Sequence, residues 1–187
     1  CRNLPPLSNT KQRSEEHTSE IHGNPMAMTK AEQYESLLPQ LAALIEHETD
    51  WIANFANTAA ALRQVFDFFW VGFYVARGQE LVLGPFQGTV ACTRIAWGKG
   101  VCGAAAQHLT TFVVPDVEQF EGHIACSSLS KSEIVVPAVA DRQCLWVLDI
   151  DSTELNTFDN TDAHYLEQIV TLLVDKHGTY LPTSLST

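Results

Sequence analysis

Cys126 is the residue of this chain whose surroundings best suit a reactive thiol. It lies in a polar stretch (EGHIACSSLSKSE), where no packing demand explains a cysteine and solvent can reach the sulfur. Cys92 lies at the start of a predicted strand, and Cys102 lies at the glycine-framed start of a predicted helix, where unpaired backbone N–H groups favour a thiolate. Cys144 lies in an apolar stretch (CLWVLDI) and is expected to be a small buried hydrophobic residue. These residues predict thiol chemistry at Cys126 and leave structural and functional roles open for Cys92 and Cys102.

Other familiar reaction centres have weaker support. His123 precedes Cys126 by three residues and could act as the base of a Cys/His hydrolase, although a single histidine in a loop is more often simply solvated. The cysteines form no CxxC pair of the kind that builds a compact zinc site, so we predict no metal site. The sequence has no GxSxG, P-loop or HExxH motif, which argues against P-loop nucleotide and zinc-protease functions.

Three carboxylates supply the second half of the predicted site. Glu133 begins one strand of a predicted hairpin, while Asp149 and Asp151 end the other strand at an apolar-to-polar transition (WVLDID). Antiparallel pairing would bring these strand ends together at one edge of the sheet, near the loop that carries Cys126. Clustered like charges raise at least one pKa, so that a protonated acid could donate to a substrate oxygen while another carboxylate binds a cation. An acidic pocket beside a thiol predicts a substrate with an ammonium group; the alternative is a set of solvated strand ends.

Aromatic residues could complete the pocket. The segment FDFFWVGFY is rich in rings, and the alternation of a strand sends Trp70 and Tyr74 to the same face. Most of these rings must belong to the core, but one or two could wall a small cavity and pack against a methyl or thioether group.

Hydrophobic periodicity predicts the elements that position these residues. Helices are expected at both ends of the chain, with a kink or break at Pro39 in the first and an N-cap at Asp50 in the second. Strands are expected between them, and a three-residue turn at 141–143 closes the carboxylate-bearing hairpin. The pattern predicts an α+β architecture with a mainly antiparallel central sheet. The expected helices are 29–47, 50–65, 101–107 and 159–176, and the expected strands are 68–76, 80–86, 91–96, 111–114, 133–140 and 144–150.

Composition narrows the class of protein. The net charge of −11, with 22 carboxylates against 11 lysines and arginines, would repel polyanions, so we expect no nucleic-acid partner. No apolar run reaches the ~20 residues that span a bilayer, and no signal-peptide pattern opens the chain, so we expect no membrane partner and a cytoplasmic location. Structural disulfides are rare in that reducing compartment, which favours catalysis, metal binding or packing for the cysteines.

The 187 residues suffice for one domain of ordinary size. We expect residues 1–27 to be a disordered leader that is not native, because RSEEHTSE resembles translated sequencing-adapter sequence and Met28 offers a start. Residues 28–180 are predicted to form a single catalytic domain, and residues 181–187 are predicted to be a tail.

Taken together, the motifs FFWVGFY, LVLGPFQG, ACTRIAWGKGVCG, VPDV, HIACSS, SEIVVP and LDIDS resemble the free methionine-(R)-sulfoxide reductases, a GAF-fold family. The resemblance runs from about Tyr34 to Leu173 in unbroken order. It implies that Cys126 is the catalytic cysteine and that Cys92 and Cys102 are the other redox cysteines. It also implies an acidic substrate pocket and an aromatic wall, and the predicted pocket residues are Glu133, Asp149, Asp151, Trp70 and Tyr74.

The resemblance further implies a mechanism. Cys126 would attack the sulfoxide sulfur, Asp151 would donate a proton to the oxygen, and a second thiol would resolve the resulting sulfenic acid, with Cys92 ranked before Cys102. Thioredoxin would reduce the disulfide, no metal or organic cofactor would be needed, and a homodimer is allowed but not required. The role would be a cytoplasmic one in oxidative stress.

Two alternatives stay open at this point. The GAF fold also hosts non-catalytic sensor modules for small molecules, and a fold alone does not determine function. A sensor has no need of a loop cysteine with two candidate partners, so the thiol set favours the reductase. The Cys/His hydrolase is the third and weakest interpretation.

Overall fold

The computed structural model describes residues 27–124 and 127–179. Cys126 lies outside the described residues, as do residues 1–26 of the predicted leader and the whole predicted tail. The described part of the chain begins with two helices, continues through a sheet with one inserted helix, and ends on a third long helix.

Within the described ranges, six strands form one antiparallel sheet in the order β3-β2-β1-β6-β5-β4. The central pair β1 and β6 buries nearly all its side chains on both faces, which explains why these segments are apolar almost throughout. The strands are β1 (Trp70–Arg77), β2 (Glu80–Gln87), β3 (Arg94–Ala96), β4 (Phe112–Val114), β5 (Ser132–Ala140) and β6 (Gln143–Ser152). The predicted α+β class is confirmed.

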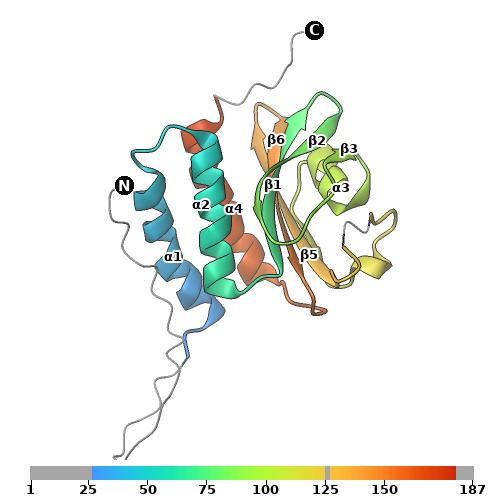
Figure 1. Cartoon of the computed structure of the whole chain (residues 1–187), viewed down its shortest axis with the longest axis horizontal. Coiled ribbons are helices and arrows are strands. Elements are labelled where there is room, and N and C mark those ends of the chain that lie inside the picture. Colours follow the sequence, from blue (N-terminus) through green and yellow to red (C-terminus); the bar gives the residue numbers. More distant parts are fainter. Residues whose placement is uncertain (1–26, 125–126, 180–187) are drawn as a thin grey trace, which may run out of the picture.

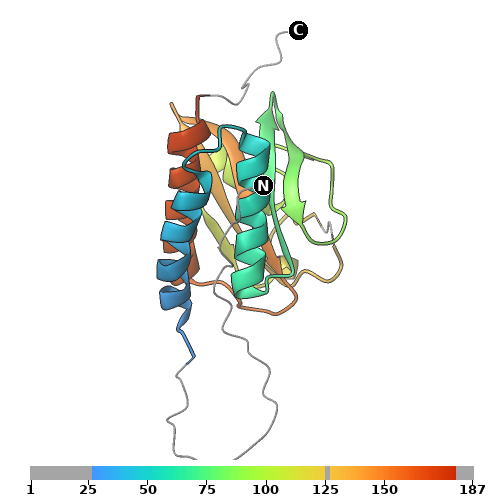
Figure 2. The same ribbon diagram turned by 60° about the vertical axis from the view of Figure 1, so that its left-hand side comes forward.

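Helices cover the two faces of the sheet unequally, as Figures 1 and 2 show. The long helices α1 (Lys30–Ile45), α2 (Trp51–Phe66) and α4 (Asn160–His177) pack on one face, and the short helix α3 (Gly100–His108) packs on the other. A turn of 3-10 helix (Val117–Gln119) follows β4.

The ends of the long helices follow local capping chemistry. Thr29 and Asp159 each form a capping box. The Asp50 side chain accepts from two backbone N–H groups of α2, which confirms the N-cap predicted there. The expected break at Pro39 is wrong. Helix α1 continues through it because the flanking Leu37 and Leu41 are buried in the same core.

Strand alternation divides the interior into two apolar layers. Val71, Phe73 and Val75 of β1 face the three long helices, whereas Trp70 and Tyr74 face α3. The predicted shared face of Trp70 and Tyr74 is therefore confirmed, and this face is the one that holds the cavity described below.

The turn of the β5–β6 hairpin is one residue shorter than expected. Ala140 pairs with Gln143, so that the turn consists of Asp141 and Arg142 alone. Both have positive φ, 48° and 62°, which matches the twist of a two-residue hairpin turn.

Among the described residues, no helix is both long enough and apolar enough to cross a membrane.

Candidate active site

The register of three neighbouring strands brings the carboxylates together. Glu133 of β5 lies opposite Asp151 of β6, and Asp151 lies opposite Trp70 of β1, so these three residues form one row across the sheet. Asp149 lies in the next row, opposite Gly72. Because residues opposite each other share a face, the carboxylates and Trp70 all point to the α3 side.

The position of this cluster in the sheet differs from the expectation, and its burial excludes the alternative of solvated strand ends. Strands β5 and β6 lie inside the sheet rather than at its edge, because β4 covers β5 and β1 covers β6. The carboxylates are also not solvated strand ends, since Glu133 and Asp149 are each only 6% exposed. Buried carboxylates need a structural or functional reason, because moving a charge out of water is costly.

A cavity opens on this face between the sheet, α3 and the loops beside it. Together with the open solvent at its mouth, it comprises about 540 Å³ of space free of protein atoms. Its walls combine rings, thiol and carboxyl groups, and they include the exposed loop residue Val90 and the half-buried His123. The lining residues are Phe69, Trp70, Tyr74, Thr89, Val90, Ala91, Ile95, Lys99, Gly100, Val101, Cys102, His123, Ile124, Ser127, Ser130, Glu133, Asp149 and Asp151.

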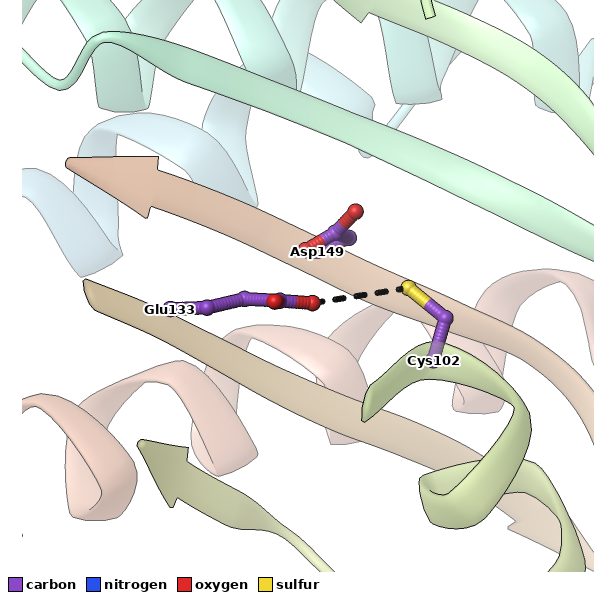
Figure 3. Close-up of side chains that lie close together, drawn as sticks. All are labelled: Cys102, Glu133 and Asp149. Carbon is purple, nitrogen blue, oxygen red and sulfur yellow. Dashed lines mark hydrogen bonds between the residues drawn. The ribbon is translucent and has the colours of Figure 1, made fainter. Parts of the chain in front are cut away.

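Cys102, Glu133 and Asp149 lie close together (Figure 3), and all three line this cavity. They come from α3, β5 and β6, and the Cys102 Sγ lies 3.9 Å from Glu133 Oε1. Burial raises the pKa of the Cys102 thiol well above its usual value, and the Asp149 and Glu133 charges raise it further. The expected thiolate at this helix start is therefore wrong: burial beside two carboxyl groups outweighs the helix N-terminus, and Cys102 stays a protonated thiol.

The two buried carboxyl groups perturb each other. Burial raises the pKa of Glu133 well above its usual value, and the Asp149 and Asp151 charges add to this. Burial and the Asp151 charge raise the pKa of Asp149 in the same way. The Oδ1 atom of Asp149 is buried and has no hydrogen-bond partner among the described residues, so it is an acceptor available to a ligand.

Asp151 is the most accessible member of the carboxylate cluster. Burial raises its pKa to about 6, and a hydrogen bond with the Ser130 side chain opposes this rise. A carboxyl group with that pKa is partly protonated near neutral pH, which is the state that a general acid requires.

The side chains of Cys102, Glu133 and Asp149 lie close enough together to surround a cation. Cys102, Glu133 and Asp149 each offer one ligand atom, and these atoms lie within 4.8 Å of one another. A small cation or an ammonium group could be held there, because both satisfy carboxylate oxygens.

An aromatic wall stands beside the carboxylates. The Trp70 ring stacks on Phe86 and Tyr74, with centroids 5.4 and 6.0 Å away, and its Nε1 donates to the Thr89 carbonyl at 3.0 Å. Gly72 makes room for it, since a Cβ there would lie 2.3 Å from Trp70 Cη2. The ring position thus depends on a glycine that sequence reasoning did not single out; its only signal was a glycine inside a strand of large residues.

The structure describes two of the three predicted redox cysteines, Cys92 and Cys102. Cys92 is disulfide-bonded, whereas Cys102 and Cys144 carry free thiols. Cys92 belongs to the loop before β3 rather than to a strand, since β3 begins at Arg94. Cys144 is 3% exposed, and burial raises its pKa to about 12, which confirms the buried, unreactive position expected for it.

Comparisons with known proteins place the chain in a family, although a scan against protein-family models finds no match. GAF domain-containing protein A of Dictyostelium discoideum is 58% identical over 146 residues, which cover 78% of this chain and 92% of that protein. Free methionine-R-sulfoxide reductase of Escherichia coli is 46% identical over 147 residues, covering 78% and 89%. The X-ray structure of free methionine-R-sulfoxide reductase from Neisseria meningitidis, in complex with its substrate, is 51% identical with a TM-score of 0.79, covering 84% and 94%.

An antiparallel sheet with long helices on one face and a short helix beside a cavity on the other defines a GAF-domain protein. With relatives at these identities and coverages, the chain belongs to the free methionine-R-sulfoxide reductase family. This confirms the family predicted from the motifs and favours an oxidoreductase over a sensor module without activity.

Proposed function

We propose that this protein reduces free methionine-(R)-sulfoxide to methionine by thiol chemistry. The observation that carries the proposal is the buried cluster of Glu133, Asp149 and Asp151 beside an aromatic wall, in a chain whose relatives carry that reductase name. Buried carboxyl groups around an unpartnered oxygen suit a small cationic ligand, and a free amino acid carries the ammonium group that they require.

Recognition of the free amino acid rests on Glu133 and Asp149. The unpartnered Asp149 Oδ1 accepts from the substrate ammonium, and Glu133 supplies a second acceptor nearby. A methionine sulfoxide inside a peptide has an amide N–H in place of the ammonium and would leave a buried carboxylate without a counter-charge. The Trp70 ring packs against the methyl group at the sulfur.

The first chemical step takes place at the sulfoxide. The Cys126 thiolate attacks the sulfoxide sulfur while Asp151, protonated in part at neutral pH, gives its proton to the oxygen. As the bond to Cys126 forms, the S–O bond of the sulfoxide breaks and the oxygen leaves as water after taking two protons. A water molecule then attacks the Cys126 sulfur and loses a proton, the S–S bond breaks with its electron pair on the substrate sulfur, methionine leaves, and Cys126 becomes a sulfenic acid. Cys126 lies outside the described residues, so its role rests on the motif around it and on the family.

The second step regenerates the thiols. The Cys92 thiol attacks the sulfenic sulfur of Cys126, a disulfide forms and water leaves; Cys102 is the second choice for this role, since its thiol is held beside two carboxyl groups. We propose thioredoxin as the external dithiol that reduces the disulfide. No metal or organic cofactor enters this cycle.

Two further expectations belong to this proposal. We expect the enzyme to work in the cytoplasm, because its thiols must return to the reduced state after each turnover. The homodimer that the family resemblance allows stays a prediction, and sedimentation equilibrium of the reduced protein would test it.

An epimer-specific assay tests the proposed function. With thioredoxin, thioredoxin reductase and NADPH, free methionine-(R)-sulfoxide should drive NADPH oxidation, and the S epimer and a peptide-bound sulfoxide should not. Cys126→Ser should abolish turnover, whereas Cys144→Ser should retain it because Cys144 lies buried outside the cavity. Equal turnover by wild type and Cys126→Ser would refute the mechanism.

Substitutions in the pocket test the ammonium site. Glu133→Gln and Asp149→Asn should each raise KM about thirtyfold or more, because losing one partner of a buried charge pair costs about 2 kcal/mol or more. Glu154→Gln, on an exposed side chain just beyond β6, is the matched control and should leave KM unchanged. Unchanged KM in both pocket variants would refute the assignment of Glu133 and Asp149 to ammonium binding.

A further inference from the structure

The loop that carries Cys92 is held by side chains of β1. Residues 88–93 connect β2 to β3 without regular structure, and Val90 within this loop is 88% exposed. The Trp70 Nε1 donates to the Thr89 carbonyl at 3.0 Å, and the Tyr74 hydroxyl donates to the carbonyl of Cys92 itself, also at 3.0 Å. Two neighbouring rings of one central strand therefore hold an otherwise exposed loop at two points.

Tyr74 is well suited to hold a fixed position. It is 1% exposed, it lies on a strand paired on both sides, and its ring stacks with that of Trp70 at 6.0 Å. Burial and the nearby Asp149 charge raise its pKa above the ordinary tyrosine value, so its hydroxyl stays protonated over the working pH range. Its hydrogen bond to the Cys92 carbonyl is thus available throughout that range.

We propose that Tyr74 is a positioning residue for the disulfide-forming step, in addition to being part of the cavity wall. This inference rests on the proposed function. In that step the Cys92 Sγ forms a bond to the Cys126 sulfur, the S–O bond of the sulfenic acid breaks, and the oxygen leaves as water with two protons. The Tyr74 hydrogen bond holds the Cys92 backbone, and hence the origin of its side chain, at one place next to Ala91 of the cavity wall.

For a geometric reason, the hydrogen bond from Tyr74 to Cys92 should affect disulfide formation more than substrate reduction. Thiol attack on a sulfenic sulfur requires a short approach along the axis of the breaking bond, and Cys92 must supply it from a loop. Substrate reduction depends instead on Cys126 and on the carboxyl groups of the cavity, whereas the hydrogen bond that the Tyr74 hydroxyl donates goes to the Cys92 carbonyl. Loss of the hydroxyl should therefore change the ratio of the two rates.

Single-turnover kinetics of Tyr74→Phe test the proposal, because this change keeps the ring and removes only the hydroxyl. Reduced protein is mixed with excess methionine-(R)-sulfoxide; methionine release is followed by quenched flow, and sulfenic acid is trapped with dimedone. The rate of disulfide formation relative to methionine release should fall about tenfold, as expected for one lost hydrogen bond, and dimedone-reactive Cys126 should accumulate.

A buried tyrosine on the other side of the sheet provides the matched control. The Tyr34 hydroxyl donates to Asp162 at 2.9 Å beneath the long helices, so Tyr34→Phe also deletes a buried tyrosine hydrogen bond. This variant should keep the wild-type ratio of the two rates even if its stability falls. If Tyr74→Phe does not fold, Trp70→Phe removes the second tether, to Thr89. Because the Trp70 ring also packs against the substrate, this variant is measured in the peroxide-driven reaction described next, where its disulfide formation should be slower than that of wild type.

Oxidation by hydrogen peroxide separates this inference from the proposed function. Peroxide converts the Cys126 thiolate to a sulfenic acid without any sulfoxide substrate, so the disulfide step can be timed alone. If wild type releases no methionine but Tyr74→Phe slows peroxide-driven disulfide formation, the proposed function fails and the role of Tyr74 stands. A wild-type ratio in Tyr74→Phe, or an equal fall in Tyr34→Phe, would overturn the positioning role.

Discussion

Replacing Asp151 by asparagine should make the folded protein more stable at alkaline pH. The pKa of Asp151 rises from an ordinary value of 3.8 to about 6 on folding, chiefly because the group is buried. Below pH 3.8 the carboxyl is protonated in both states and folding carries no ionisation cost. Between the two values the folded state holds a proton that the unfolded state has lost, so stability falls as pH rises through this window.

The size of the effect follows from the shift. The pKa difference of Asp151 between the folded and unfolded states lowers the free energy of unfolding by roughly 3 kcal/mol at pH 8 and roughly 1.5 kcal/mol at pH 5, since each pKa unit corresponds to about 1.36 kcal/mol. Asp151→Asn cannot ionise, so its free energy of unfolding should exceed that of wild type by amounts approaching these values. Such a gain is typical of a group kept for activity at the expense of stability.

Urea denaturation of the reduced proteins at pH 5 and pH 8 measures the difference. Asp175→Asn, which removes an exposed carboxylate on α4, is the control and should show no comparable growth of the difference with pH. An Asp151→Asn variant that is less stable than wild type at pH 8, or a stability difference that does not grow from pH 5 to pH 8, would refute the reasoning.

Two other predictions concern the same face of the sheet. If protonated Asp151 is the acid, the ratio of wild-type to Asp151→Asn single-turnover rates should fall about fiftyfold between pH 6 and pH 8, following the protonated fraction of a group with pKa about 6; a flat ratio would exclude this role. Gly72→Ala would place a Cβ 2.3 Å from the Trp70 ring and 2.6 Å from Phe86 Cβ, so it should lower the free energy of unfolding by about 2 kcal/mol and raise KM. Denaturation and steady-state kinetics would measure both effects, and a neutral result would show that the ring can move freely.

The sequence predicted the elements well wherever one residue class repeats with a clear period. The apolar spacing of α4 and its Asp159 cap, and the ring-rich run of β1, were sufficient to locate both elements. A helix break at Pro39 was not found, because burial on both sides of Pro39 keeps the helix intact. The predicted three-residue hairpin turn was wrong, because Asp141 and Arg142 adopt positive φ and close the turn with two residues.

The sequence alone predicted only part of the candidate site. Hairpin pairing was enough to bring Glu133 near Asp151, since both lie on adjacent strands of one local unit. The approach of Cys102 was not foreseen, because α3 reaches the sheet through tertiary packing and no local rule states which strand residues it covers. Its high pKa follows from that packing, so the local argument from the helix start gave the wrong protonation state.

The sequence alone determined which chemical groups the protein has and most of the local geometry: thiols, carboxyl groups in a β-hairpin, rings on one face of a strand, and motifs specific enough to name a family. Tertiary structure alone decided how buried each group is and what lies beside it. Those two quantities set the pKa of Asp151, the unpartnered oxygen of Asp149 and the hydrogen bond from Tyr74 to Cys92. The reason is physical: ionisation and hydrogen bonding depend on distance and local dielectric, which segments far apart in the chain create only when they pack together.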